Sequence, residues 1–520
     1  EILHVSDDAA HHKDPRFVGS IRAALAHPQV HEIVIYPGTY VEHLTIAPRT
    51  APLLMRSATG KAADVVITFD LCQGDRDASG MPFGQNCATL TVDADDVTLR
   101  ELTIANPSDA RERPGATDTQ AIALRTRGTR ITIERCHLLG RQDTVLLDAP
   151  SWGALRHVLL RDCLIEGDVD FIYGRATAAI TGGEIRSVGP GYIAAPSTPQ
   201  ENPRGLLFLN VALTAADGVA DGSVHLARPW HPGGVPFAVG QARFVDVRVG
   251  AHIATQRWAD MGGYSWQTGG RFSEESEIPD GAAIVSEHLT GWEGLPPANG
   301  RVHVFSDSTA SFYEPARAPR TGWAQALAEL TDREVRNHAV SGMSTQSLID
   351  SGHLDARLRT ISPGDLVLIG FGHNDSKPDH RHADPARAYP TNLRRVIIGV
   401  RSRGATPVLL TSVERRSFVQ GAAQSTHGGY PEAVRRLAEA EGITLIDLTR
   451  LSRDLWQAMG EEGSKAAFLH LAPGQWPGYP DGEVDDTHLS RAGAHAIAQM
   501  VLDVIALDPT SPSLNQSGRP

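Results

Sequence analysis

The sequence predicts two domains, a right-handed parallel β-helix followed by a flavodoxin-like α/β domain with a three-layer parallel sheet. Three observations predict this: a chain of 520 residues, β-branched runs that repeat without helices between them, and a later change to alternating strands and helices. A chain of this length exceeds one ordinary hydrophobic core. We expect a first domain over residues 1–292, a linker over 293–300, a second domain over 301–508 and a tail over 509–520.

The composition is that of a globular protein, with 41% hydrophobic and 21% charged residues. The formal net charge of −13 argues against non-specific binding to nucleic acid or to an anionic membrane. No run approaches the roughly 18 apolar residues of a membrane span. The four cysteines show no spacing typical of structural zinc. Because the chain begins at Glu1 without Met, any targeting leader is out of view.

The first domain is predicted from short runs that share one pattern, in which alternating aliphatic residues precede a polar bend and a further apolar pair. These runs are 96–106, 130–140, 156–167 and 178–188. Strand repeats of this length bury their apolar faces only by stacking, which favours a parallel β-helix. A β-sandwich is the alternative, but hairpin turns such as Asn-Gly are scarce. Residues 16–27 form the one helix expected here.

Two stretches, "RCHLLGRQDT" (135–144) and "DCLIEGDVDF" (162–171), match each other in register. The matching pairs, each 27 residues apart, are Cys136/Cys163, Gly140/Gly167 and Asp143/Asp170. In a β-helix such positions stack at about 4.8 Å, which would place the two aspartates side by side. The two cysteines would then be near enough for a disulfide, although buried thiols fit equally well. Cys72 and Cys87 flank a glycine-rich loop that a disulfide could close.

Two stacked carboxylates cannot both ionise easily, so we expect one pKa to rise and the other to stay low. Such a pair supplies a general acid and a nucleophile from one residue type. The alternative is that Asp is a common turn residue and the match is a remnant of repetition.

Five motifs in order resemble the pectin methylesterase family over roughly residues 1–290. They are "PGTYVE" (37–42), "QAIAL" (120–124), "GRQDT" (140–144), "DFIYG" (170–174) and "ARPW" (227–230). The resemblance implies a parallel β-helix that hydrolyses the methyl esters of galacturonate in pectin, with no metal or other cofactor. It also implies that Asp170 is the nucleophile, that Asp143 is the general acid and base, and that Arg228 holds Asp170 ionised.

The same resemblance implies that the side-chain amides of Gln142 and Gln120 stabilise the oxyanion. Tyr173 and Trp230 would offer flat surfaces for sugar rings, and Tyr192 is expected to bind substrate as well. Tyr173 stands where the family usually has Phe.

From about residue 301 the pattern changes to buried strands that alternate with amphipathic helices. The expected strands are 301–307, 334–340, 365–372, 406–413 and 443–449, and the clearest helices are 430–442 and 490–507. Apolar strands alternating with helices predict a parallel sheet covered on both faces.

Four polar motifs follow these strands or precede the last helix, at positions where open α/β sheets bind ligands. They are "VFSDST" (304–309), "SGMST" (341–345), "GFGHND" (370–375) and "DDTHLS" (485–490). Ser308 needs a base, and His488 with Asp485 on one short turn can supply it. The backbone N–H groups of Ser308 and Gly342, with the Asn374 amide, can form an oxyanion hole.

This second set resembles the SGNH (GDSL-type) hydrolases, in particular their rhamnogalacturonan acetylesterase-like branch, over roughly 300–508. Ser308, Gly342, Asn374 and His488 match the four block residues, whereas Ser306 replaces the glycine that the family has two positions before the serine. No G-x-S-x-G motif surrounds the serine, which argues against an ordinary α/β-hydrolase.

The two resemblances together predict a bifunctional enzyme that removes methyl and acetyl esters from pectin, whether homogalacturonan or rhamnogalacturonan. We expect a secreted or periplasmic protein that acts without a cofactor and has neither nucleic-acid nor membrane partners. A pectate lyase is disfavoured because the sequence shows no calcium-binding carboxylate cluster. The alternative from another class is a polysaccharide-binding protein with only one active esterase domain.

Overall fold

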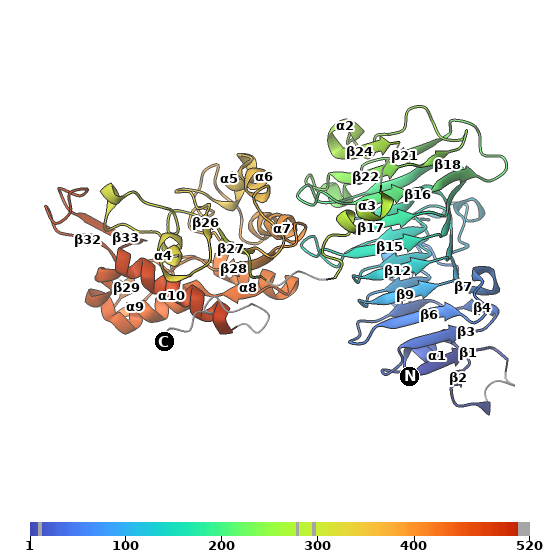
Figure 1. Cartoon of the computed structure of the whole chain (residues 1–520), viewed down its shortest axis with the longest axis horizontal. Helices are drawn as coiled ribbons and strands as arrows, with labels where there is room; N and C mark the ends of the chain where they lie inside the picture. Colours follow the sequence, from blue (N-terminus) through green and yellow to red (C-terminus); the bar gives the residue numbers. More distant parts are fainter. Residues whose placement is uncertain (9–12, 277–279, 294–297, 508–520) are drawn as a thin grey trace. The chain divides into compact units, whose positions relative to one another are not determined.

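The computed structural model describes residues 1–8, 13–276, 280–293 and 298–507 (Figure 1). The chain divides into two compact units, Glu1–Trp292 and Glu293–Pro520. Residues 294–297 of the expected linker and the expected tail over 509–520 lie outside the described residues.

The first unit is a parallel β-helix, as predicted. In Figure 1 the strands of its longest ladder rise one above another from β1 toward β24. In spatial order this ladder contains β2 (Phe17–Val18), β1 (Ile2–Val5), β3 (Glu32–Ile35), β6 (Leu53–Ser57), β9 (Val97–Arg100), β12 (Ile131–Glu134), β15 (His157–Arg161), β17 (Thr177–Thr181), β19 (Leu206–Leu209), β22 (Gly240–Val245) and β24 (Gly270–Glu275).

Two further ladders share the long strands β16 (Leu164–Gly174) and β18 (Glu184–Pro196). One contains β4 (Gly38–Val41), β7 (Val65–Thr68), β10 (Thr103–Ala105), β13 (His137–Leu139), β20 (Ala212–Ala215) and β23 (Arg248–Val249). The other contains β5 (Leu44–Ile46), β8 (Leu90–Val92), β11 (Leu124–Thr126), β14 (Val145–Leu147) and β21 (Val224–Ala227).

Alternation within each strand builds the core of the β-helix. In β12, Ile131 and Ile133 are fully buried, and they pair in register with Val158 and Leu160 of the next coil. Columns of aliphatic side chains therefore run through the interior, and each coil is stabilised by its neighbours.

The predicted 27-residue register is confirmed. Strand β13 pairs His137 with Leu164 of β16, and β14 pairs Val145 with Ile172 of the same strand. Part of the sequence match has a steric origin, because a Cβ on Gly167 would lie 2.2 Å from Cβ of Phe171. A Cβ on Gly140 would lie 2.6 Å from the Thr144 hydroxyl oxygen.

All four cysteines are buried and free, so neither of the possible disulfides is present. Cys136 and Cys163 belong to the interior hydrophobic core of the β-helix. Their shared register therefore serves packing.

The helix predicted over 16–27 is wrong in its first part. Residues Phe17–Val18 form strand β2, and only Ile21–Leu25 form helix α1, whose N-cap Ser20 accepts a hydrogen bond from the Ala23 amide. Strand pairing with β1 overrides the helical pattern of the first residues. The described part of the first unit also contains the short α-helices α2 (Trp266–Gly269) and α3 (Gly281–His288). Helix α3 is fastened to the β-helix by the His288 ring, which bonds the Gly205 carbonyl at 3.0 Å.

The second unit is built on a five-stranded, fully parallel sheet with the order β26-β25-β27-β28-β31. Its strands are β26 (Val335–Asn337), β25 (Val302–Ser306), β27 (Leu366–Gly370), β28 (Thr406–Leu410) and β31 (Leu445–Ile446). This is the flavodoxin-like order that the sequence predicts. Two antiparallel pairs lie outside the sheet, β29 (Phe418–Val419) with β30 (Ala422–Ala423), and β32 (Phe468–Leu471) with β33 (Glu483–Leu489).

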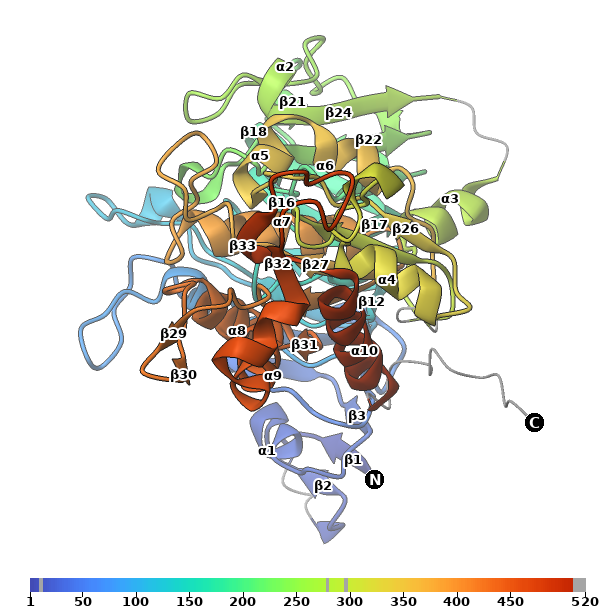
Figure 2. The ribbon, with the colours of Figure 1, turned by 90° about the vertical axis from the view of Figure 1, so that its left-hand side faces the viewer.

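Helices cover both faces of this sheet, because residues of β27 alternate between two hydrophobic clusters. Leu366 and Leu368 pack with α4 (Trp323–Leu330), α9 (Leu448–Gly463) and α10 (Arg491–Leu507). Val367 and Ile369 pack with α5 (Thr345–Asp350), α6 (His353–Leu358), α7 (Ala388–Arg401) and α8 (Tyr430–Glu441). Figure 2 shows α4 and α10 beside each other, where an ion pair between Glu329 and Arg491 joins them at 2.8 Å.

The steric role of Gly167 predicts a loss of stability when a methyl group is added. We expect Gly167→Ala to lower the free energy of unfolding of the first unit by about 1–3 kcal/mol, because the new Cβ forces strand β16 or Phe171 to shift. Gly281→Ala is the matched control, since its Cβ would meet only Leu209 Cδ2 at an ordinary 3.4 Å. Calorimetry of the full chain measures both variants, and equal melting temperatures would contradict the steric account.

Candidate functional site

The two duplicated aspartates lie where strand geometry is irregular. Asp143 comes just before β14, and its amide donates to the Val169 carbonyl at 3.0 Å. Asp170 lies within β16, whose pairing with β18 shifts register on both sides of Val169. Both aspartates have left-handed backbones, with φ of 71° and 49°. Such bulges redirect side chains and are frequent beside active sites.

Arg228 binds both carboxylate oxygens of Asp170 through one edge of its guanidinium. Nε donates to Oδ1 at 2.8 Å and Nη2 donates to Oδ2 at 2.6 Å. The guanidinium carbon also lies 3.8 Å from the centre of the Tyr192 ring. This bidentate contact, with stacking on an aromatic ring, fixes the position of Asp170.

Within the described residues no arginine or lysine forms an ion pair with Asp143, and its pKa therefore differs from that of Asp170. Burial, followed by the negative charge of Asp170, raises the pKa of Asp143 well above its ordinary value. The expectation that the second pKa stays low is wrong, because burial also raises the pKa of Asp170. The hydrogen bonds and charge of Arg228 oppose that rise. Asp170 is therefore the carboxyl that ionises first, and Asp143 is the one that keeps its proton longest.

Gln120 and Gln142 lie on neighbouring coils. The Ala121 amide donates to the Gln142 carbonyl at 3.2 Å, and both glutamine side chains are partly exposed. The side-chain oxygen of Gln120 is buried and has no hydrogen-bond partner in the described part of the chain. Buried acceptors are normally hydrogen-bonded, so the oxygen of Gln120 is free to accept a hydrogen bond from a molecule bound at this site.

The three aromatic residues expected to bind sugar have different environments. The expectation that Tyr173 offers an open stacking surface is wrong, because coil packing leaves it only 3% exposed. Its ring packs edge-on against Trp230 at 5.3 Å, and Trp230 itself is partly exposed. Tyr192 is also partly exposed and stacks on His225 at 5.6 Å.

In the second unit, Ser308, His488 and Asp485 form a hydrogen-bonded chain. His488 Nε2 lies 3.0 Å from Ser308 Oγ, and His488 Nδ1 lies 2.6 Å from Asp485 Oδ2. Burial raises the pKa of Asp485, but hydrogen bonds from His488 and from the Thr487 amide outweigh it and leave the pKa well below its ordinary value. Asp485 therefore stays ionised and orients the imidazole toward the serine.

The expected short turn that carries Asp485 and His488 is instead part of strand β33, which pairs with β32. The turn geometry survives locally, because Asp485 Oδ1 accepts bonds from the amides of Thr487 and His488 at 2.8 and 3.0 Å. The pairing of β33 with β32 is irregular between Asp485 and Leu489, and this irregularity leaves room for the local turn that holds the carboxylate and the imidazole together.

The turn at 341–345 contains Gly342, whose φ is 81°. Hydrogen bonds connect this turn to strand β25, which ends just before Ser308, and to Asn374. The Val340 amide donates to the Ser306 carbonyl at 3.2 Å, and Asn374 Nδ2 donates to the Met343 carbonyl at 3.0 Å. The second Nδ2 hydrogen of Asn374 is not used in that bond. Gly342 and Asn374 are thus assembled beside the strand that leads to Ser308.

Three further residues support the second site in roles that the sequence analysis did not assign. The Tyr313 hydroxyl donates to the Ser308 carbonyl at 2.7 Å, and the buried Ser306 hydroxyl donates to the Gly370 carbonyl at 2.6 Å. Asp375 accepts bonds from the amide and hydroxyl of Thr345, and burial raises the pKa of Asp375 to about 7. Asp375 had a signal in its place within "GFGHND" and Ser306 in its replacement of the family's glycine, whereas Tyr313 had none.

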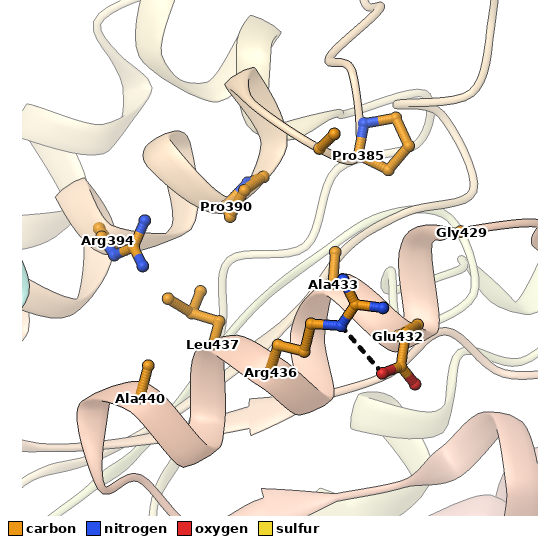
Figure 3. Close-up of a pocket in the computed structure, with 10 residues that line it drawn as sticks. Pro385, Pro390, Arg394, Gly429, Glu432, Ala433, Arg436, Leu437 and Ala440 are labelled. Carbon is orange, nitrogen blue, oxygen red and sulfur yellow. Dashed lines mark hydrogen bonds and ion pairs between the residues drawn. The ribbon is translucent and has the colours of Figure 1, made fainter.

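A separate groove lies between α7 and α8 (Figure 3). Pro385, Pro390, Leu437 and Arg436 are among its lining residues, and Arg436 pairs with Glu432 at 3.1 Å. Ser308, His488 and Asp485 are not among the residues that line this groove.

Among the described residues there is no cluster of His, Cys, Asp or Glu that could hold a metal ion. In the same residues no helix has the length and apolarity needed to cross a membrane.

Comparison with known proteins agrees with this division. A pectinesterase family model matches residues 16–263, and a GDSL-like lipase/acylhydrolase model matches residues 307–496. Rhamnogalacturonan acetylesterase RhgT of Bacillus subtilis is 40% identical over 208 residues, which cover 39% of this chain and 89% of that protein. A pectinesterase of Ralstonia solanacearum is 29% identical over 267 residues, covering 46% of this chain and 66% of the relative.

A solved pectin methylesterase in complex with a hexasaccharide has 24% identity and a TM-score of 0.47, and the match covers 57% of this chain and 98% of that one. The β-helix with paired aspartates and the α/β unit with a Ser–His–Asp chain define a two-domain hydrolase. Through its second unit the chain belongs to the GDSL-like lipase/acylhydrolase family, and its first unit is similar to pectinesterases.

The hydrogen-bonded serine predicts selective labelling by a fluorophosphonate. We expect Ser308 to be modified and the buried Ser306 to remain unmodified, because only Ser308 has a base within hydrogen-bond distance. Asp485→Asn should slow the labelling about a thousandfold, since the imidazole loses its orienting carboxylate. Peptide mass spectrometry measures both. Labelling at Ser306, or an unchanged rate in Asp485→Asn, would show that the chain of hydrogen bonds does not activate Ser308.

Proposed function

We propose that this chain is a bifunctional pectin de-esterifying enzyme. Its first unit hydrolyses the methyl esters of galacturonate, and its second unit hydrolyses O-acetyl esters of pectin sugars. The observation that carries the first activity is the asymmetry of the aspartate pair, in which Arg228 binds Asp170 alone. The names of the relatives, pectinesterase and rhamnogalacturonan acetylesterase, support the substrate class.

In the first unit, the Asp170 carboxylate attacks the ester carbonyl and forms an acyl-enzyme anhydride. The amides of Gln142 and Gln120 stabilise the developing oxyanion. Asp143, protonated because of its raised pKa, gives its proton to the departing methoxide, so methanol leaves. The resulting Asp143 carboxylate then takes a proton from water, which attacks the anhydride and restores Asp170. Trp230 and Tyr192 form the sugar-binding surface.

In the second unit, His488 takes the Ser308 proton while the serine oxygen attacks the acetyl carbonyl. The N–H groups of Ser308 and Gly342 and the free N–H of Asn374 bind the oxyanion. The protonated imidazole gives its proton to the sugar hydroxyl, which leaves. Water, deprotonated by His488, then releases acetate from the acetyl-enzyme.

Pectin is an extracellular polymer, so the proposal includes action outside the cytoplasm, in a secreted or periplasmic protein. Removal of both ester types exposes the galacturonan backbone to chain-cleaving enzymes.

Two variants separate the activities. With acetylated, methylated pectin as substrate, we expect Asp170→Asn to lower methanol release by at least about a thousandfold, and Ser308→Ala to do the same for acetate. Each variant should keep the other activity, which also shows that the chain folds. Methanol release that survives Asp170→Asn would contradict the aspartate mechanism. If the unmutated chain releases no acetate, the second unit acts on another ester or is inactive.

The ion pair between Arg228 and Asp170 predicts how the pH dependence of methanol release changes when the arginine is replaced. Removing the guanidinium in Arg228→Gln raises the pKa of Asp170, so less of the carboxylate is ionised at a given acidic pH. The acid limb of kcat/KM for methanol release should therefore move to higher pH by about one unit or more. Arg243→Gln removes a similar bidentate pair, with Glu275 on another coil, and should leave the limb in place. A limb that stays in place in Arg228→Gln would contradict the assignment of Asp170 as the nucleophile.

A further inference from the structure

A guanidinium nitrogen of Arg381 lies beside Gly342 in the second unit. A Cβ built on Gly342 would lie 3.9 Å from Arg381 Nη1. Apart from the chain neighbours of Gly342, no other atom of the described residues comes within 4 Å of that position. The space beside the predicted oxyanion donor is therefore open, with one guanidinium nitrogen at its edge.

Arg381 is held in this place by Asp379. Its Nε donates to Asp379 Oδ1 at 2.9 Å and its Nη2 donates to Oδ2 at 2.6 Å. The Arg381 amide donates to the same carboxylate at 2.9 Å. The guanidinium lowers the pKa of Asp379 well below its ordinary value, so the carboxylate stays ionised through the neutral and mildly acidic range.

This clamp occupies only one edge of the guanidinium. Arginine carries five N–H donors, and the two on Nη1 make no hydrogen bond within the described residues. The Arg381 side chain is 27% exposed, so this edge is accessible from solvent. A guanidinium that is fixed in place and has unused N–H donors can bind a second planar anion, above all a carboxylate.

The bound ester determines which anion comes near. An acetyl group whose carbonyl oxygen is held by the Gly342 amide leaves its sugar ring and the ring substituents beside the turn. In a uronate those substituents include a carboxyl group, which is anionic when free and neutral when methylated. Neutral acetylated sugars offer no partner for Arg381.

We propose that Arg381 binds the free carboxylate of an acetylated uronate, and that the second unit prefers such residues to their methyl esters. This inference rests on the proposed acetylesterase function. It also sets an order of reactions. Hydrolysis of the methyl ester converts ester and water into methanol, a carboxylate and a proton. The first unit thus produces the group that Arg381 recognises, and de-methylation precedes efficient de-acetylation.

Acetate release from acetylated galacturonate oligosaccharides tests the proposal. The full chain carries Asp170→Asn, so that methyl esters remain in place during the assay. One substrate has free carboxyl groups and the other is fully methylated. We expect KM to be about tenfold lower for the free acid, with a smaller change in kcat, because the contact binds ground state and transition state alike. The preference should weaken at high salt.

Variants assign the preference to the residue. Arg381→Gln should remove most of the KM difference, and Arg381→Lys should keep part of it because the charge remains without the fork. Arg436→Gln is the control for net charge, since Arg436 lies in the groove of Figure 3 and pairs with Glu432. Hydrolysis of 4-nitrophenyl acetate reports whether the Ser308 site is intact in each variant.

The outcomes are distinguishable. Equal KM values for the two substrates, or a preference that persists in Arg381→Gln, would overturn the inference while acetate release still supports the proposed function. If neither acetylated substrate yields acetate, the proposed function of the second unit fails.

Discussion

In-register stacking of parallel coils is the constraint on which the first site depends. Each strand pairs with the same position of the next coil, so a residue repeated at the coil length returns to the same place one strand spacing away. Asp143 and Asp170 are brought together in this way. Val169, the residue before Asp170, pairs with Tyr192 on the next coil, and Tyr192 pairs with His225 on the coil after that. Arg228 follows on the same coil as His225 and reaches back to Asp170.

Stacking gives Asp143 and Asp170 equivalent positions on adjacent coils, and nearby charge then gives the two carboxyl groups different pKa values. Burial raises the pKa of both carboxyl groups, and only Asp170 receives the guanidinium of Arg228. The same residue type is tuned in the opposite direction in the second unit, where hydrogen bonds keep Asp485 ionised. In the first unit a single arginine separates the nucleophile from the acid. In the second unit an aspartate held by backbone amides fixes the histidine. Environment, more than residue type, sets the role.

Features that follow from residue periodicity, repeats or motif order could be predicted from the sequence. Alternating aliphatic residues predicted the strands, the 27-residue match predicted the register, and motif order predicted that Ser308 and His488 meet. Features that depend on packing between distant coils or loops were not predictable. The burial of Tyr173 follows from its neighbours on adjacent coils, and the bond from Tyr313 to the Ser308 carbonyl has no sequence signature. Helix α1 is shorter than its pattern because strand pairing claims Phe17.

The coupling of the two stacked aspartates is the central claim, and infrared titration of the full chain measures it most directly. A protonated buried carboxyl has a C=O stretching band that disappears on ionisation, and loss of the band in Asp143→Asn assigns it. The account predicts that this band titrates above the ordinary pKa of aspartic acid. It also predicts that Asp170→Asn lowers the midpoint, because the neighbouring negative charge is gone. A midpoint that is unchanged in Asp170→Asn would contradict the account.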